Sequence, residues 1–383
     1  MTSDNRPYDT RPYRILTPGD PAPWFYQRST SNENYAFSSV AGRYVVLCFY
    51  GSAADPMARE ALGTIAADRN CFDDDRACFF GVSLDPSDEA EGRVKQRLPG
   101  IRFFWDFDGA IGTEYGAVVD RSSAAGAVIE ASYRRHTLLL DPLLRVVAVL
   151  SYDDSPETHV ARLLTAMASM PPVGAPSLAD SQAPVLIAPR VFEPELCRML
   201  IEYYQARGGH ESGFMRERDG LTVRMTDYGH KRRRDEEIAD ERLRKACMVR
   251  IHDRLAPEIH KAFQFRATRI ERYVVACYDA AEEGHFRPHR DNTTKGTAHR
   301  RFAVSLHLNT GEYEGGYLRF PEFGAQLYAA PLGGAVVFSC SLLHEATPVT
   351  KGRRFMFLPF LYDDAAAQIR DRNLAFVADP GAG

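Results

Sequence analysis

The chain has 383 residues, of which 45% are hydrophobic and 26% charged, a balance typical of a globular protein with ample core for two domains. Its formal net charge of −4 argues against a general nucleic-acid role. No apolar run approaches membrane-spanning length, and residues 1–11 are polar and charged, without the apolar core of a signal peptide. We therefore expect neither a nucleic-acid partner nor a membrane.

The cysteines are scattered and contain no C-x-x-C pair. They are Cys48, Cys71, Cys78, Cys197, Cys247, Cys277 and Cys340. Several lie inside apolar runs, where cysteine behaves as a small buried hydrophobe. This usage is typical of a reducing compartment, so we expect a cytoplasmic protein.

The first part of the chain alternates predicted strands, over residues 44–50, 79–84 and 136–140, with predicted helices over 55–69 and 157–170. This alternation predicts an α/β domain over residues 1–168. Residues 169–184 are rich in Pro, Ala and Ser without periodicity, which indicates a linker. A second domain is then expected over residues 185–383.

The first domain resembles the peroxiredoxin branch of the thioredoxin fold, from about residue 16 to 168. The matching stretches are Pro18–Pro23, Gly42–Tyr50, Val82–Asp85, Tyr115–Ala117 and Leu138–Asp141. A working peroxiredoxin needs a thiolate in the turn after its first core strand, with a pKa lowered by a helix N-terminus. That turn, residues 51–60, contains no cysteine, and Cys48 lies inside the strand. We predict a thioredoxin-like scaffold without peroxidase chemistry.

The second domain opens with predicted helices. Leu196, Met199, Leu200 and Tyr203 recur at helical spacing, which predicts a helix over 193–207, and a further amphipathic helix is expected over 236–255. Between them lie four consecutive basic residues, 231–234. Such a run is usually a solvated face. The alternative is a loop at the mouth of an active site that steers an anionic group of the substrate.

A metal site is predicted by the motif His289-Arg290-Asp291, which follows a β-rich stretch over 273–278, and by the later His344. Two imidazoles and one carboxylate on one face of an octahedral metal leave three positions open. This is the ligand set of non-haem Fe(II) oxygenases. We therefore predict that His289, Asp291 and His344 bind iron.

Two further stretches alternate like strands. Residues 301–309 place the polar side chains of Arg301, Ser305, His307 and Asn309 on one face and apolar side chains on the other. Arg353 and Arg354 begin an apolar strand that runs to residue 361. Because successive side chains of a strand alternate faces, only one of these two arginines can point inward.

In these stretches residues 187–364 resemble a prolyl-4-hydroxylase-type 2-oxoglutarate, Fe(II)-dependent dioxygenase. The matching pieces, in order, are Tyr278, Phe286–Asn292, Leu306–Asn309, Glu314–Pro321, Gly333–Phe338 and His344 to Arg354. The resemblance implies a double-stranded β-helix, or jelly roll, with flanking helices and the metal inside the mouth of the barrel.

The resemblance also implies cofactors and their ligands. The cofactors are Fe(II) and the co-substrate 2-oxoglutarate, with ascorbate as a further candidate. The pattern H-x3-P-V-x2-G-x-K/R places the cation for the far carboxylate of 2-oxoglutarate at Arg354, and a bidentate arginine suits a carboxylate. Tyr278 and His307 match positions whose side chains hydrogen-bond the co-substrate, although the family more often has tyrosine at the place of His307.

Two classes of function remain. The first is a dioxygenase that hydroxylates a C–H bond of a peptidyl, prolyl-like or amino-acid-derived substrate and releases succinate and CO2. Desaturation or cyclisation stays open, whereas halogenation is disfavoured because Asp291 fills the position that a halide would need. The second is a thioredoxin-fold interaction or sensor module whose metal-binding barrel has no turnover. The substrate stays open, and a homodimer is the candidate assembly because redoxin-type domains often pair.

Overall fold

A computed structural model describes residues 15–67, 71–122, 128–152, 155–174, 178 and 181–378. The chain divides into two compact units, residues 1–176 and 177–383. The polar segment 1–11 of the sequence analysis lies outside the described residues. So do the last two residues of the predicted helix 55–69 and parts of the predicted linker, residues 175–177 and 179–180.

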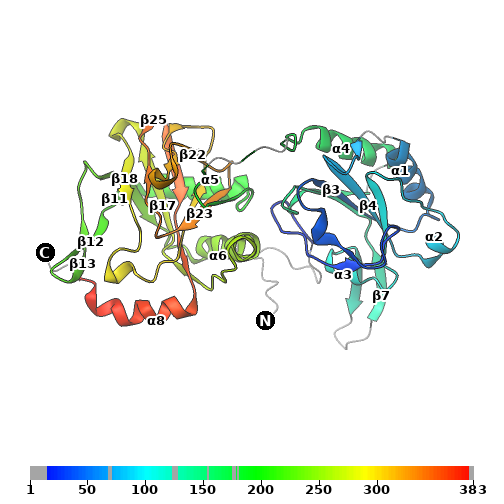
Figure 1. The fold of residues 1–383 in the computed structure, drawn as a ribbon, viewed down its shortest axis with the longest axis horizontal. Helices are drawn as coiled ribbons and strands as arrows, with labels where there is room; N and C mark the ends of the chain where they lie inside the picture. Colours follow the sequence, from blue (N-terminus) through cyan, green and yellow to red (C-terminus); the bar gives the residue numbers. More distant parts are fainter. Residues whose placement is uncertain are drawn as a thin grey trace. The chain divides into compact units, whose positions relative to one another are not determined.

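The first unit is built on a five-stranded sheet (Figure 1). In spatial order its strands are β5 (Ile101–Trp105), β4 (Ala77–Ser83), β3 (Tyr44–Gly51), β8 (His136–Leu140) and β9 (Val146–Ser151). β3 pairs in parallel with β4 and antiparallel with β8. Nearly every residue of β3 is buried, as expected of a central strand that is covered on both faces.

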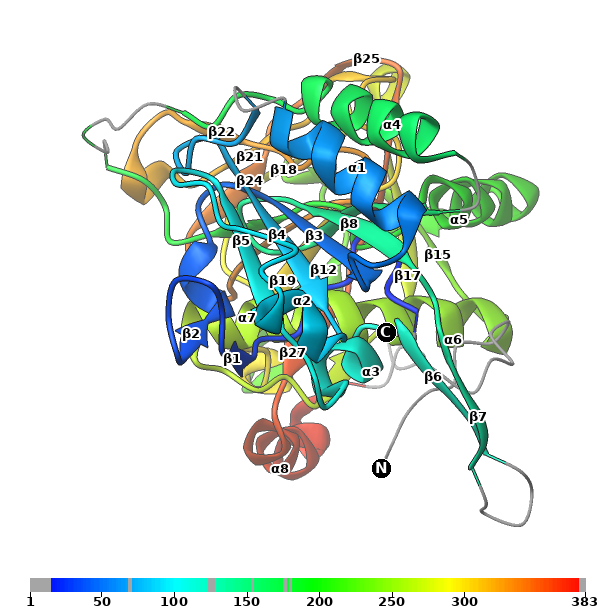
Figure 2. The ribbon, with the colours of Figure 1, turned by 90° about the vertical axis from the view of Figure 1, so that its right-hand side faces the viewer.

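Helices cover the two faces of this sheet. α1 (Pro56–Ala67) and α4 (Pro156–Ala168) lie side by side over one face, as Figure 2 shows, and pack on Val46, Cys48 and Phe79. The other face holds a second core with Val45, Leu47 and α3 (Ala110–Glu114). The remaining elements are β1 (Tyr26–Gln27), β2 (Tyr35–Ala36), α2 (Pro86–Ala90), β6 (Val118–Ser122) and β7 (Val128–Tyr133). This arrangement confirms the predicted thioredoxin-like α/β fold.

The second unit contains two antiparallel sheets that face each other. The larger follows the order β10 (Leu186–Ala188), β23 (Ala335–Ser339), β19 (Phe302–His307), β26 (Arg353–Phe357), β17 (Val274–Asp279), β15 (Arg234–Glu237) and β11 (His210–Glu211), with β27 (Phe360–Tyr362) beside β19 and β16 (Arg269–Glu271) beside β27. The smaller follows β14 (Lys231–Arg232), β18 (His285–His289), β24 (His344–Ala346), β21 (Leu318–Arg319) and β22 (Leu327–Tyr328). Two hairpins are β12 (Phe214–Arg218) with β13 (Leu221–Met225) and β20 (Glu314–Gly315) with β25 (Val349–Lys351).

The two faces of the larger sheet pack against different parts of the domain. Val304 and Leu306 of β19 pack outward on α5 (Pro194–Arg207), α6 (Glu241–Arg250) and α7 (Ala256–Phe263). Tyr278 and Met356 point the other way and contact Phe286 of the smaller sheet. Two sheets packed over a shared interior, with helices outside, confirm the predicted jelly roll. A last helix, α8 (Asp364–Asn373), follows the barrel.

The predicted helix over residues 236–255 is wrong at its start and interrupted near its end. Residues up to Glu237 belong to β15, whose backbone pairs with β17, so sheet pairing decides their conformation. α6 begins only at Glu241, after Asp240 accepts a hydrogen bond from the backbone N–H of Leu243 at 3.0 Å. A π-helical turn, Ile251–Leu255, then leads into α7.

None of the helices in the described part of the chain is long and apolar enough to cross a membrane.

Candidate metal centre

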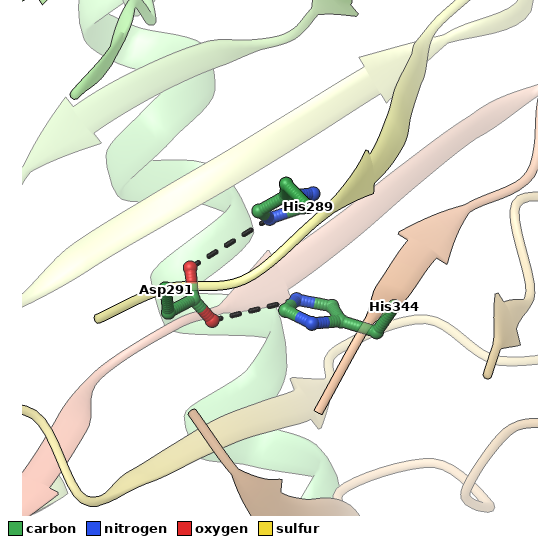
Figure 3. Close-up of side chains that lie close together, drawn as sticks. All are labelled: His289, Asp291 and His344. Atoms are coloured by element: carbon green, nitrogen blue, oxygen red, sulfur yellow. Dashed lines mark ion pairs between the residues drawn. The ribbon is translucent and has the colours of Figure 1, made fainter. Parts of the chain in front are cut away.

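Strand pairing brings the three predicted metal ligands together. β18 and β24 are neighbours, and His289 lies directly opposite His344 in their register. The two ring centroids are 4.3 Å apart. Asp291 follows β18 by two residues, and its carboxylate lies between the two imidazoles (Figure 3). The end of β18 and its pairing with β24 thus place the three side chains around one point.

The geometry suits one ion. The Nε2 atom of His289 is 3.6 Å from one carboxylate oxygen of Asp291, and that of His344 is 3.4 Å from the other. One ligand atom from each of the three residues lies within 4.8 Å of the others. Neighbouring ligands at about 2.1 Å from an octahedral ion are roughly 3 Å apart, so a small closure completes the site.

Backbone carbonyls select the ring tautomers. Nδ1 of His289 donates to the carbonyl of Arg287 at 2.8 Å, and Nδ1 of His344 donates to that of Leu342 at 3.0 Å. With the proton held on Nδ1, each Nε2 presents a lone pair toward Asp291. This is the form in which histidine binds a metal.

Electrostatics favour the ligating protonation states. Burial raises the pKa of Asp291, but His344 and His289 outweigh it, so the pKa lies well below its usual range. Burial and the neighbouring His289 lower the pKa of His344 to about 4. Near pH 7 the site therefore offers a carboxylate and a neutral imidazole.

Arg300, Glu271 and His299 form a polar cluster beside the backbone of Asp291. No sequence motif indicated this cluster. Arg300 donates to the backbone carbonyl of Asp291 at 3.3 Å and to both oxygens of Glu271 at 2.6 and 2.9 Å. Glu271 also contacts Nε2 of His299 at 2.7 Å. Nothing in their local sequence pattern distinguishes these residues from surface charges, because only the folded sheet brings them together.

Arg354 and Arg353 point to opposite faces, as strand alternation requires. Arg354 pairs in register with Tyr278 and is 1% exposed. Arg353 keeps a 54% exposed side chain, 4.0 Å from Asp279. The guanidinium of Arg354 lies 5.1 Å from the ring centre of Tyr278 and 3.5 Å from the hydroxyl of Ser305, and its Nε has no hydrogen-bond partner. Within the described residues no carboxylate pairs with Arg354.

Tyr278 and His307 differ in their access to the site. Tyr278 lines a cavity of about 470 Å³ together with the three predicted metal ligands, Ser305 and Arg354. His307 is fully buried and does not line that cavity. Its Nδ1 lies 3.0 Å from the hydroxyl of Tyr313, its Nε2 has no partner, and burial together with Arg354 lowers its pKa well below the usual value. Contact of His307 with a co-substrate stays a prediction.

Comparison with known families decides what this barrel is. Residues 273–362 match the 2OG-Fe(II) oxygenase superfamily. The chain carries a 2OG-Fe(II) oxygenase domain. The match confirms the predicted family and with it the predicted cofactors, Fe(II) and 2-oxoglutarate. Residues 18–149 match the AhpC/TSA family, which confirms the peroxiredoxin-like resemblance of the first unit.

Individual relatives are distant. A PKHD-type hydroxylase of Azoarcus sp. (strain BH72) is 33% identical over 110 residues, which are 26% of this chain and 47% of that protein. The chain thus matches about half the length of this curated relative.

Solved structures resemble each unit separately. A prolyl hydroxylase from Trichoplax adhaerens, in complex with a hypoxia inducible factor peptide, is 15% identical with a TM-score of 0.40 over 50% of this chain and 87% of that one. A Pseudomonas putida prolyl-4-hydroxylase is 17% identical, with a TM-score of 0.36 over 47% and 93%. The peroxidoxin BcpB from Mycobacterium tuberculosis is 22% identical, with a TM-score of 0.34 over 41% and 99%.

In the oxygenase domain the basic run 231–234 spans β14 and the first residue of β15. Its side chains alternate between the cavity and the opposite side. Lys231 and Arg233 are buried and line the cavity, whereas Arg232 and Arg234 do not line it. The interpretation of this run as a solvated face is therefore wrong for Lys231 and Arg233.

Cys48, which precedes the cysteine-free turn of the AhpC/TSA domain, lacks the properties of a reactive thiol. Cys48 is fully buried in β3, with its Sγ 3.2 Å from the hydroxyl of Tyr152, and burial raises the pKa of Cys48. In the cysteine-free turn the backbone N–H of Ala53 donates to the carboxylate of Asp88 at 2.9 Å. The carboxylate of Asp88 therefore already occupies one backbone N–H donor of that turn.

Proposed function

We propose that this chain is an Fe(II)- and 2-oxoglutarate-dependent dioxygenase that hydroxylates a C–H bond of a peptidyl, prolyl-like or amino-acid-derived substrate. The observation that carries the proposal is one cavity that holds two imidazole lone pairs, a carboxylate and an unpaired buried arginine. Such a set fits an iron ion and the far carboxylate of a dicarboxylic co-substrate, because a buried arginine is stable only when its charge is compensated.

Each residue has a role in this proposal. His289, Asp291 and His344 would hold the iron, and the fork of Arg354, beside Ser305 and Tyr278, would hold the far carboxylate of 2-oxoglutarate. When bound, iron and 2-oxoglutarate supply oxygen activation, in which the oxo acid becomes succinate and CO2 and the substrate gains a hydroxyl group.

Aromatic rings and backbone carbonyls orient the two imidazoles. The Phe286 ring stacks on His289 with a centroid distance of 3.5 Å, and the Phe338 ring meets His344 edge-on at 4.5 Å. The carbonyls that accept from each Nδ1 hold the rings in their ligating orientation.

All seven cysteines are free thiols, which supports a reducing, cytoplasmic setting.

Turnover without a known substrate tests the proposal. Protein is titrated with Fe(II) and 2-oxoglutarate without oxygen, and succinate is measured after oxygen is admitted. We expect saturable binding of both and slow, oxygen-dependent succinate formation. Metal binding without any consumption of 2-oxoglutarate would favour the alternative, a redoxin-type interaction or sensor module with a metal-binding barrel.

A further inference from the structure

The cavity carries more positive charge than the co-substrate needs. Seven basic side chains line it. They are Arg216, Lys231, Arg233, Arg272, Arg290, Arg300 and Arg354. Three are neutralised by carboxylates, since Arg233 lies 2.6 Å from Asp235, Arg290 lies 2.7 Å from Glu322 and Arg300 lies 2.6 Å from Glu271. Arg216 belongs to the exposed hairpin β12–β13.

Three cations are left without a carboxylate within 4.0 Å in the described part of the chain. They are Lys231, Arg272 and Arg354. Arg354 is assigned above to 2-oxoglutarate, whose other carboxylate would lie on the metal. Neither Lys231 nor Arg272 then forms a close ion pair of its own, because the carboxylates that act on them from further away, Asp235 and Glu271, are paired with Arg233 and Arg300.

Arg272 is held in the cavity by its backbone. It lies between β16 and β17 with φ 53°, a left-handed conformation that non-glycine residues seldom adopt. Its Nε donates to the carbonyl of Leu358 at 3.0 Å, and its guanidinium lies 4.4 Å from the ring centre of Phe360. These contacts leave the two terminal nitrogens, the fork that binds oxyanions, without a partner among the described residues.

Lys231 adds to the same potential. It is 5% exposed, and its Nζ donates to the hydroxyl of Ser212 and the carbonyl of Gly213, both at 2.7 Å. An ammonium group has three donors, so one remains. Burial and the nearby Arg233 lower the pKa of Lys231 well below its usual value, and Arg272 is close enough to contribute. The empty cavity therefore disfavours the charged ammonium, and a bound anion would favour it again.

The backbones of Arg272 and Arg354 lie near opposite ends of β17. Arg354 pairs with Tyr278 near the end of β17, whereas Arg272 precedes the start of that strand. The strand spans about 17 Å at roughly 3.3 Å per residue. The two arginines thus enter one cavity from different ends of the strand, an arrangement that suits two separate anionic groups.

We propose that Arg272, in the positive field of Lys231, binds a carboxylate of the substrate, so that the substrate is a carboxylate-bearing small molecule. This inference rests on the proposed function and narrows its substrate class. An internal residue of a peptide other than Asp or Glu has no carboxylate of its own to offer, whereas a free or N-acylated amino acid does. A cavity of about 470 Å³ falls within the range of small-molecule sites, roughly 300–1,000 Å³.

Paired ligands that differ only in charge test the inference. The full chain is loaded with Mn(II), which replaces iron without redox chemistry, and with saturating 2-oxoglutarate. Binding of N-acetyl amino acids, of their primary amides and of inorganic phosphate is then measured by calorimetry. We expect at least one acid to bind about ten-fold or more tightly than its amide, and Arg272→Gln to remove this preference.

Three results would overturn the inference. They are the absence of any acid-over-amide preference, its persistence in Arg272→Gln, and binding of phosphate where no acid binds. Arg232→Gln is the matched control, because Arg232 follows Lys231 in β14 but lies 3.0 Å from Glu283 at the surface. The control should keep the wild-type preference.

A second variant covers failure of the first to fold. Lys231→Met should weaken acid binding several-fold and leave amide binding unchanged, and equal affinities of Lys231→Met and wild type for the acid would also overturn the inference. The same titrations separate the two proposals. A wild-type chain that binds neither Mn(II) nor 2-oxoglutarate contradicts the proposed function, whereas one that binds both without an acid preference contradicts only this inference.

Discussion

One buried charge in each unit shows how the two units differ. In the first unit Asp88 is fully buried, yet its carboxylate accepts hydrogen bonds from the Ser83 hydroxyl at 2.7 Å and from the backbone of Ala53. In the second unit Arg354 is equally buried and has no carboxylate partner in the described residues. A satisfied buried charge stabilises a scaffold, whereas an unsatisfied one indicates a ligand that the fold awaits. The comparison indicates that the first unit is a structural scaffold and that the second unit binds the ligands and reacts.

The strongest test of the comparison removes a metal ligand. His289→Ala or His344→Ala should abolish Fe(II) retention and turnover, because two remaining ligands cannot complete the facial set. Bound iron is measured after gel filtration, and succinate formation in the same samples. His285→Ala is the control, since His285 belongs to β18 as well but lies outside the triad. Unchanged iron content in either triad variant would contradict the ligand assignment.

Arg354→Ala should come next in size. Iron should be retained, because Arg354 is not a metal ligand, while loss of a desolvated arginine–carboxylate pair costs roughly 2–5 kcal/mol. This corresponds to a loss of 2-oxoglutarate affinity of about thirty-fold to several thousand-fold, which anaerobic titration measures.

Arg353→Ala is the matched control for that experiment, because its side chain is exposed on the opposite face of β26. Weakened 2-oxoglutarate binding in Arg353→Ala alone would mean that the two arginines are assigned in the wrong order. Unchanged binding in both variants would contradict the co-substrate site.

The sequence predicted what short motifs and strict alternation encode. The H-x-D motif indicated two of the three candidate metal ligands directly, and alternation predicted that Arg353 and Arg354 face opposite ways. Arg272 and Glu271 could not be found in this way, because their roles depend on contacts with Phe360 and Arg300, which lie far along the chain. The same holds for residues 236–237, whose strand conformation comes from pairing with β17.

A smaller effect, on the pH dependence of stability, is expected from His136 in the scaffold unit. This histidine is 2% exposed and stacks on Phe49. Burial lowers the pKa of His136 to about 4, below its ordinary value of 6.5. Between these pH values the folded state binds fewer protons than the unfolded state. The contribution of His136 to the free energy of unfolding is therefore complete above pH 6.5 and is lost as the pH falls toward 4. The loss should be about 1–3 kcal/mol.

His136→Phe should remove this part of the pH dependence and preserve the ring stack. Tryptophan fluorescence in urea isolates the scaffold unit, because both tryptophans, Trp24 and Trp105, belong to it. Burial raises the pKa of Asp106 to about 6, so its contribution has the opposite sign and is lost as the pH rises through 6. Asp106 is present in both proteins and cancels in the difference. Equal pH slopes of wild type and His136→Phe would contradict the prediction.

The smallest expected effect is none at all, for Cys48. A peroxidatic cysteine must be a thiolate that peroxide can reach. Cys48 fails on both counts, because it is 0% exposed inside β3 and burial raises its pKa. Cys48→Ser should therefore reduce hydrogen peroxide, with a thiol donor, at the wild-type rate.

Cys71 supplies the control for that assay. All seven cysteines lie in the described part of the chain, and Cys71 alone among them is partly exposed. Any slow background consumption of peroxide should accordingly fall in Cys71→Ser and not in Cys48→Ser. A robust thiol-dependent rate that one cysteine replacement abolishes would restore peroxidase chemistry to the first unit. The contrast between a scaffold and a reacting domain would then fail, since unsatisfied charge in the second unit would no longer single out the part of the chain that reacts.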